Sequence, residues 1–356
     1  MLSLSAETAY SSCQTLQACI SLPRDIVKIP AIEKRLGERR KVFLSRRLPD
    51  AVEQRAAERY TLLRNPNDVV LAPEVLAESA EGCDYILTSA MQPIPSCVFD
   101  RLRGTLKAVG TLSVGYNHVD LEAARASGVA VFYSPGVLSD ACAELAVMLL
   151  LNAARRAHEA DTLMRSGKWA GFAPTQLLGI ALTGRRAGIL GMGRIGQAVA
   201  KRLAAFGVEL HYHNRSQLER AQEMGATYHD SSESLLKVSD FLLLLAPGSD
   251  ELRGFLNKRR IDLLPPNAVV VNISRGDTVD DDALIGALQS GRVFAAGLDV
   301  FACEPNFDQR YKSLTNVFLT PHIASATEDA RNAMGFIVLD GFQALEEGRK
   351  IENQLC

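Results

Sequence analysis

Residues 186–206, RAGILGMGRIGQAVAKRLAAF, decide the fold expected of this chain. The apolar run 187–190 predicts a buried strand, glycines follow at 191, 193 and 196, and residues 195–206 have the apolar spacing of an amphipathic helix. In such a turn the first glycine permits a tight bend, the second lets the backbone approach a pyrophosphate, and the third allows close helix–strand packing. The stretch therefore predicts a dinucleotide-binding unit whose cofactor contacts are Gly191, Gly193, Arg194, Ile195 and Gly196.

Strands and helices are predicted to alternate on both sides of this unit. Short apolar runs predict strands at 41–45, 60–64, 84–89, 106–111, 129–133, 186–190, 208–213, 241–246, 269–273, 295–300 and 317–320. Helical patterns fall at 50–58, 73–80, 121–127, about 140–165 and 328–346. Such alternation is typical of parallel sheets covered on both faces. We expect an α/β fold with two doubly wound parallel-sheet domains, a flavodoxin-like substrate domain and a Rossmann cofactor domain, flanking a cleft.

The length of 356 residues predicts two domains, because a single core rarely grows to that size. Ser134-Pro135-Gly136 interrupts the first series of strands, and the last helix is long enough to return to it. We therefore assign residues 40–135 plus 323–356 to the substrate domain and 136–322 to the cofactor domain. Residues 1–39 are polar and poorly periodic, so they are expected to form a loosely ordered N-terminal extension.

The composition excludes several classes of function. A formal net charge of −2 gives no electrostatic reason to expect nucleic acid or an anionic membrane as partner. No apolar run reaches the roughly 18 residues of a membrane span. The seven cysteines form no CxxC pair and none lies at zinc-ligand spacing from a histidine, so neither a metal site nor a disulfide framework is expected. The chain does not begin with a secretory signal pattern, which predicts a cytoplasmic protein.

The strand after the glycine turn indicates which nicotinamide cofactor is preferred. A carboxylate near its end would accept hydrogen bonds from the ribose 2′-hydroxyl of NAD. This strand instead ends in His-Tyr-His-Asn-Arg-Ser at 211–216, with no acidic residue. Arg215 can pair with a 2′-phosphate, and Asn214 and Ser216 can donate hydrogen bonds to it. NADP(H) is therefore the expected cofactor, with NAD(H) also possible because some NAD enzymes carry a basic residue here.

Three polar residues follow apolar runs near the end of the second series: Arg275, Glu304 and His322. A guanidinium can hold a substrate carboxylate by a bidentate pair, and an imidazolium can protonate a keto oxygen as hydride arrives. A carboxylate can orient that imidazole. Each residue alone could equally be structural. Their joint placement after strands beside a dinucleotide site predicts a catalytic set for the reduction of a 2-keto acid.

At these residues the chain resembles the D-isomer-specific 2-hydroxyacid dehydrogenase family. The matching stretches are LGMGRIG, VNISRGDTVDDDAL, GLDVFACEP and TPHIASAT, and the resemblance covers about residues 41–350. It implies that Arg275, Glu304 and His322 are catalytic. It also implies that the backbone N–H groups of Val114 and Gly115 hold the substrate carboxylate. Further contacts implied by the resemblance are Ile273 and Asp299 with the nicotinamide carboxamide, and Ala246 and Pro247 with the adenosine.

Within the family the chain is most similar to the glyoxylate/hydroxypyruvate reductases, and the resemblance implies a homodimer. Many relatives carry two tryptophans in the segment that matches 168–174. Here Trp169 is followed by Phe172, a smaller ring that could enlarge the substrate pocket or simply fill the dimer interface. Reduction of a larger acid, such as 2-ketogluconate or an aryl-pyruvate, therefore stays open.

Other members of the family fit the sequence less well. A phosphoglycerate dehydrogenase is disfavoured because no regulatory domain follows residue 350, and a formate dehydrogenase because Glu304 stands where that group has glutamine. A dinucleotide-sensing corepressor, which retains the same three residues, is disfavoured by the missing acidic residue after the second strand.

Overall fold

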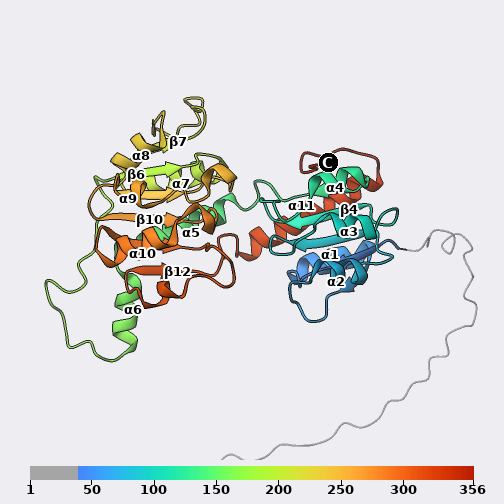
Figure 1. Cartoon of the computed structure of the whole chain (residues 1–356), viewed down its shortest axis with the longest axis horizontal. Helices are drawn as coiled ribbons and strands as arrows, with labels where there is room; N and C mark the ends of the chain where they lie inside the picture. Colours follow the sequence, from blue (N-terminus) through green and yellow to red (C-terminus); the bar gives the residue numbers. More distant parts are fainter. Residues whose placement is uncertain (1–38) are drawn as a thin grey trace, which may run out of the picture. The chain divides into compact units, whose positions relative to one another are not determined.

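The computed structural model describes residues 39–356, and the predicted N-terminal extension lies outside this part except for its last residue. Residues 40–356 contain two parallel sheets (Figure 1). The strands of the first sheet have the order β2-β1-β3-β4-β5. They are β1 (Lys41–Leu44), β2 (Thr61–Arg64), β3 (Tyr85–Ser89), β4 (Ala108–Leu112) and β5 (Ala130–Phe132).

The second sheet is larger, and its strands have the order β12-β11-β10-β9-β6-β7-β8. They are β6 (Arg186–Leu190), β7 (Glu209–His213), β8 (Thr227–Tyr228), β9 (Phe241–Leu244), β10 (Ala268–Asn272), β11 (Val293–Leu298) and β12 (Val317–Leu319). All pairings in both sheets are parallel. Two parallel-sheet α/β domains are thus confirmed, as the alternation of elements predicted.

Helices cover both faces of each sheet because the strands are apolar on both sides. In β1, Val42 and Leu44 enter one core with Phe342 of the last helix, whereas Phe43 enters the core on the opposite face. The α-helices are α1 (Asp50–Arg59), α2 (Pro73–Ser79), α3 (Ser96–Arg101), α4 (Leu121–Ala126), α5 (Ser139–Ala154), α6 (Ala157–Arg165), α7 (Arg194–Ala204), α8 (Ser232–Val238), α9 (Lys258–Ile261), α10 (Asp281–Gln289) and α11 (Glu328–Glu346). Short 3₁₀ turns are η2 (Asp250–Leu252), η3 (Gly276–Thr278) and η4 (Gln309–Ser313).

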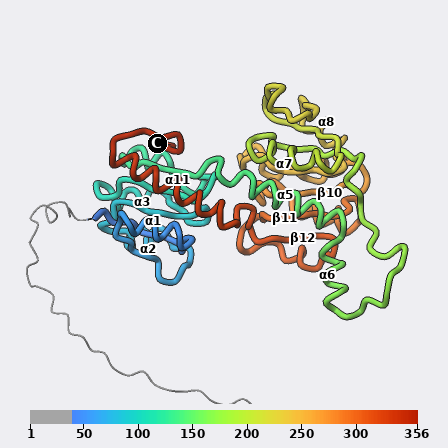
Figure 2. The backbone as a smooth tube through the Cα atoms, turned by 180° about the vertical axis from the view of Figure 1, so that it is seen from behind, coloured from blue at the N-terminus to red at the C-terminus, as the bar shows by residue number. Residues whose placement is uncertain are grey.

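Two helices that lie far apart in the sequence pack on different sheets. Helix α5 packs against β10, β11 and α7, and α11 packs against β4 and α1 (Figure 2). The bounds of α11 agree with the helix predicted at 328–346. The membership of α11 is consistent with the predicted return of the chain to the first domain, although the domain boundaries themselves stay a prediction.

The prediction of one long helix at about 140–165 was wrong. The chain leaves the helical conformation after α5, and Arg156 adopts a φ of 55° before α6 begins. A left-handed residue cannot continue a right-handed helix, so α6 starts in a new direction. Helix α6 has no buried residue, and the segment that follows it, 166–176, is exposed.

Among residues 39–356, no helix is long and apolar enough to cross a membrane.

Candidate active site

The predicted site residues of the second sheet follow the carboxyl ends of its strands. Strands β9, β10 and β11 end two, one and two residues earlier than the sequence predicted, at Leu244, Asn272 and Leu298. As a result Ala246, Ile273 and Asp299 lie in the loops beyond the sheet. Ligands of open parallel sheets bind at this edge, because the loops there alternate with helix N-termini.

The glycine loop between β6 and α7 has the geometry expected of a phosphate cradle. Gly191 has a φ of 99°, and a Cβ there would lie 2.4 Å from the backbone N of Ala246. A Cβ on Gly196 would lie 2.4 Å from the Gly191 carbonyl oxygen, whereas one on Gly193 would meet nothing within 4 Å. The first and third glycines are therefore needed for packing, and the second leaves space for a ligand.

The N-terminus of α7 offers free backbone donors beside that space. Gly193 caps the helix without a side-chain hydrogen bond, and the amide of Gln197 is the first to bond back, to the Gly193 carbonyl at 2.9 Å. The preceding amides of the first turn have no partner within the helix, and the helix dipole favours an anion there. These residues fit the pyrophosphate of a dinucleotide, and their contacts with a cofactor stay a prediction.

The segment after β7 is tied to the glycine loop by Asn214. The Asn214 Oδ1 accepts a hydrogen bond from the Met192 N–H at 2.6 Å. Arg215 and Ser216 are exposed next to it. Within residues 39–356, no carboxylate forms an ion pair with Arg215, so its guanidinium is available to an anionic ligand.

Glu304 and His322 form a direct pair. His322 Nδ1 lies 2.7 Å from Glu304 Oε2, and the second carboxylate oxygen accepts the Phe301 N–H at 2.8 Å. His322 has a φ of 53° and is held by its N–H, which donates to the Asp299 carbonyl at 2.8 Å. This left-handed backbone turns the imidazole toward Glu304 although 18 residues separate the two.

The Glu304 carboxylate is held in its ionised form. Burial alone would raise the pKa of Glu304, but the hydrogen bonds from His322 and Phe301, together with the charge of Arg275, outweigh it. The pKa of Glu304 therefore lies below its usual value. An ionised carboxylate accepts from both donors, so it can fix the orientation of the His322 ring.

Asp299 organises the loop that carries His322. Its side chain is fully buried, and Oδ1 accepts from Thr320 Oγ1 at 2.6 Å and from the Ile323 N–H at 2.8 Å. Oδ2 accepts from the Ala324 N–H at 2.9 Å. Burial raises the pKa of Asp299, and these three hydrogen bonds offset the shift only in part. Asp299 thus anchors the backbone on the C-terminal side of His322.

Arg275 lies against the loop that follows β4 of the other sheet. A Cβ added to Gly115 would lie 1.9 Å from Arg275 Nη2, and one added to Gly248 would lie 2.6 Å from Arg275 Cγ. Arg275 Nη1 donates to the Ser274 carbonyl at 2.7 Å, and its own carbonyl accepts from Asn272 Nδ2 at 2.9 Å. The structure therefore brings together Arg275 and Gly115, which are 160 positions apart in the sequence.

Three further predicted residues are Val114, Pro247 and Ile273. Val114 is 39% exposed, and Pro247 is exposed as well. Ile273 packs against both the core beside α5 and the core beside α11. The roles assigned to these three residues stay predictions.

Two groups of polar residues near the site escaped the sequence analysis. His118 Nε2 lies 2.9 Å from Thr111 Oγ1, which lies 2.7 Å from Ser113 Oγ. His118 follows the loop predicted to bind the carboxylate, but nothing in the pattern showed which side chains it would meet.

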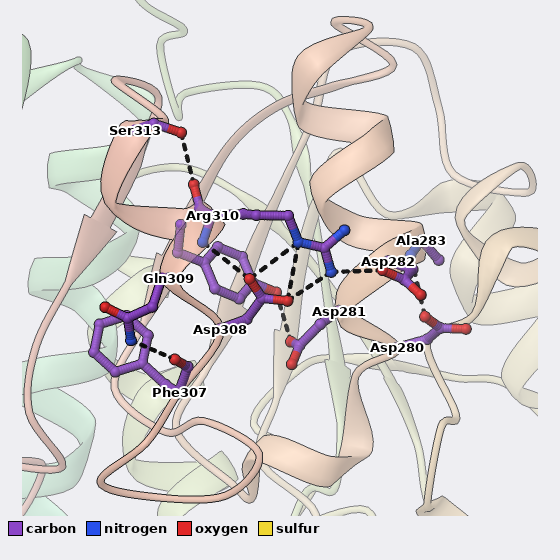
Figure 3. A network of polar contacts seen from close by, with 10 residues as sticks. Asp280, Asp281, Asp282, Ala283, Phe307, Asp308, Gln309, Arg310 and Ser313 are labelled. Atoms are coloured by element: carbon purple, nitrogen blue, oxygen red, sulfur yellow. Dashed lines mark hydrogen bonds and ion pairs between the residues drawn. The ribbon is translucent and has the colours of Figure 1, made fainter.

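The other group anchors the chain beyond Glu304 (Figure 3). Arg310 Nη2 lies 2.5 Å from Asp282 Oδ1 and 2.5 Å from Asp308 Oδ2. The buried Tyr311 donates to Asp281 Oδ1 at 2.7 Å. Because Arg310 and Asp282 are largely exposed, we ascribe the anchoring mainly to Tyr311.

Comparison with known proteins identifies the family of this fold and site. The model of the D-isomer specific 2-hydroxyacid dehydrogenase NAD-binding domain matches residues 147–324. Glycerate dehydrogenase of Hyphomicrobium methylovorum is 39% identical over 320 residues, which cover 89% of this chain and 99% of that protein. The chain belongs to the D-isomer specific 2-hydroxyacid dehydrogenase family. It is therefore an oxidoreductase with an NAD-binding Rossmann domain.

Solved structures agree with this assignment. A D-isomer specific 2-hydroxyacid dehydrogenase from Polaromonas sp. JS6 66 has a TM-score of 0.87 at 52% identity, covering 89% of this chain and 99% of that one. An NADPH-dependent glyoxylate/hydroxypyruvate reductase from Sinorhizobium meliloti, in complex with NADP and malonate, has a TM-score of 0.78 at 34% identity. The match covers 89% of this chain and 97% of that structure. The predicted family is confirmed, and the relatives support the reduction of 2-keto acids.

Proposed function

We propose that this dehydrogenase reduces a small 2-keto acid, glyoxylate or hydroxypyruvate, to the D-2-hydroxy acid with NADPH. The observation that carries the proposal is the His322–Glu304 pair, with Nδ1 and Oε2 2.7 Å apart, together with an arginine that lies against the loop of Gly115. A proton donor and a carboxylate-binding guanidinium are the two groups that this reduction demands of a protein.

Arg275 and the Gly115 loop hold the substrate. The guanidinium forms a bidentate pair with the substrate carboxylate or polarises the keto oxygen, and the backbone N–H groups of Val114 and Gly115 donate to the same carboxylate. A Cβ at Gly115 would lie 1.9 Å from Arg275 Nη2, so a side chain there would displace the guanidinium from this loop. Substrate binding is thus shared by residues from both sheets.

His322 supplies the proton. Its Nδ1–H donates to the ionised Glu304, so Nε2 is the nitrogen that faces away from the carboxylate and carries the transferable proton. Glu304 stabilises the positive charge that the ring holds before transfer. When bound, the reduced nicotinamide provides the hydride. In the oxidative direction, His322 accepts the proton of the hydroxyl group.

The glycine loop and the segment after β7 hold the cofactor. Three features support the preference for NADPH: Arg215 has no ion-pair partner among residues 39–356, Asn214 is bonded to the glycine loop, and no acidic residue takes the position that would bind a ribose 2′-hydroxyl. The Sinorhizobium relative is an NADPH-dependent enzyme.

We also propose a homodimer formed through α6 and the segment after it. Phe172 is 87% exposed, Trp169 is 49% exposed and Met164 on α6 is 58% exposed. Helix α6 buries no residue in the chain itself, and a helix of 9 residues is too short to be stable without tertiary packing. A second copy of this chain would cover these apolar side chains. Light scattering that gives a monomer would contradict the proposal.

Steady-state oxidation of NADPH and of NADH, each with glyoxylate, hydroxypyruvate, 2-ketogluconate and phenylpyruvate, tests the function. We expect the highest kcat/KM with NADPH and one of the two small acids, and its loss in His322→Gln. Arg215→Gln should weaken NADPH far more than NADH, and the exposed Arg220→Gln provides a control of equal charge on the same loop.

Each other outcome has a distinct meaning. A preference for the larger acids would keep the mechanism and shift the substrate, with Phe172 as the first residue to exchange. Equal kcat/KM with both cofactors would refute the role of Arg215. Cofactor binding without any turnover would favour a dinucleotide-sensing protein.

A further inference from the structure

Two buried hydroxyl groups and the half-buried His118 form a chain of hydrogen bonds that ends at the backbone of Gly115. His118 Nε2 is 2.9 Å from Thr111 Oγ1, Thr111 Oγ1 is 2.7 Å from Ser113 Oγ, and Ser113 Oγ is 2.7 Å from the Gly115 carbonyl oxygen. Thr111 is fully buried and Ser113 is 7% exposed. Water therefore has little access to the two hydroxyl groups, and losing a partner would leave a buried hydroxyl unpaired.

The direction of every bond in this chain follows from its last member. A carbonyl oxygen only accepts, so Ser113 Oγ donates its single proton to Gly115. Ser113 Oγ must then accept a hydrogen bond from the Thr111 hydroxyl. Because Thr111 donates its only hydroxyl proton to Ser113, Thr111 Oγ1 must accept a hydrogen bond from His118 Nε2. This series of hydrogen bonds, from His118 through Thr111 and Ser113 to Gly115, is called the relay below. It requires a proton on His118 Nε2, and the donor of each of its three bonds is thereby assigned.

His118 stays neutral in this arrangement. Burial, and secondarily the charge of Arg275, lower the pKa of His118 to about 4. The backbone of His118 is fixed as well, because its carbonyl accepts from the Ile94 N–H at 2.7 Å. The relay therefore begins at a rigid, uncharged donor next to the guanidinium that we assign to the substrate.

The relay ends at Gly115, a residue whose own backbone conformation is weakly restricted. A side chain at position 115 would displace the Arg275 guanidinium, so glycine lets the two lie against each other. Glycine has more backbone freedom than any other residue, and its freedom would let the carboxylate-binding amides turn away. The hydrogen bond from Ser113 Oγ to the Gly115 carbonyl fixes the peptide plane that follows Gly115 and closes a turn around the two amides that precede it.

We propose that His118, Thr111 and Ser113 are positioning residues that fix the substrate-carboxylate loop and thereby set the affinity for the substrate. This inference rests on the proposed function, since it takes Val114 and Gly115 to bind the carboxylate. Within residues 39–356, the side chains of these three residues form no hydrogen bond with the cofactor loop or with His322, so we assign their contribution to substrate binding and not to proton transfer.

Thr111→Val tests the relay, because valine keeps the shape of threonine and removes only the hydroxyl group. We expect KM for glyoxylate, and Kd for oxalate measured by calorimetry on the NADP-loaded protein, to rise about tenfold. We expect kcat and Kd for NADPH to change less than about twofold. Ser113→Ala gives the same measurement if the valine variant does not fold.

The matched control is Thr88→Val on the neighbouring strand. Thr88 pairs in register with Thr111, is also fully buried, and bonds Ser45 Oγ at 2.7 Å instead of the relay. The Thr88→Val variant should lose about as much stability as Thr111→Val, but its affinity for oxalate should equal that of the wild type. His118→Gln, which retains a donor at the place of Nε2, should bind oxalate like the wild type, and His118→Leu should resemble Thr111→Val.

The outcomes separate the two proposals. Any of three results would overturn the relay. They are an unchanged oxalate affinity in Thr111→Val, a loss of oxalate affinity in Thr88→Val equal to that in Thr111→Val, and no oxalate binding by the wild-type protein. Intact oxalate binding without turnover of any 2-keto acid would instead overturn the proposed reaction and leave the relay to be judged by oxalate affinity alone.

Discussion

Glu304→Gln is the substitution that discriminates most sharply between a catalytic and a structural role for the His322 pair. Both carboxylate oxygens accept, one from His322 Nδ1 at 2.7 Å and one from the Phe301 N–H at 2.8 Å. A glutamine of the same shape has only one acceptor oxygen. If that oxygen keeps the Phe301 bond, the amide NH₂ faces Nδ1, and the ring can hold no proton on that nitrogen.

The size of the effect follows from the bond that is lost. A hydrogen bond between charged partners contributes about 1.5–3 kcal/mol, which corresponds to roughly a tenfold to 150-fold change in a rate or equilibrium constant. We expect kcat/KM for glyoxylate to fall by that factor.

The assay is kcat/KM with NADPH and glyoxylate across the neutral pH range, with Kd for NADPH as a measure of intact folding. Glu328→Gln, an exposed carboxylate in the first turn of α11, is the control for lost charge. A kcat/KM for Glu304→Gln within about twofold of the wild type at every pH would refute the reasoning.

Three further predictions concern the surroundings of the pair. Gly115→Ala places a methyl group 1.9 Å from Arg275 Nη2, so kcat/KM should drop at least about tenfold while NADPH still binds. A variant whose kcat/KM equals that of the wild type would show that Arg275 does not act at this loop. Asp299→Asn removes one acceptor oxygen and leaves a buried backbone N–H, such as that of Ala324, without a partner. The free energy of unfolding measured in urea should therefore fall by about 1–3 kcal/mol. An unchanged midpoint of urea unfolding would contradict the role of Asp299 in holding this loop. The pKa of His118 is about 4 in the folded chain and about 6.5 in the unfolded chain. Between these two pH values the unfolded state binds more protons than the folded state. The free energy of unfolding should therefore fall as the pH decreases from about 6.5 to about 4, by roughly 3 kcal/mol at most. His118→Gln should lose this part of the pH dependence, and parallel stability curves for the two proteins would count against it.

The sequence predicted the elements of the fold better than their ends. The apolar runs of the strands and the period of α11 are local properties, because each reports which side of one element is buried. The ends of β9, β10 and β11 were placed one or two residues too far, since Ala246, Ile273 and Val300 prolong the apolar run after the backbone has left the sheet. The break at Arg156 escaped notice for a similar reason, because its left-handed backbone leaves no mark on the periodicity.

What the sequence by itself determined is the alternation of strands with helices, the glycine loop, and the placement of Arg275, Glu304 and His322 after strands of the second series. The edge of a parallel sheet collects whatever follows its strands, so those assignments needed no coordinates. Only the tertiary structure decided that Glu304 bonds His322 and that Arg275 lies against Gly115. It also decided that His118 reaches that loop through Thr111 and Ser113. Such contacts depend on left-handed turns and on the packing of segments distant in the chain, and neither has a local signature in a single sequence.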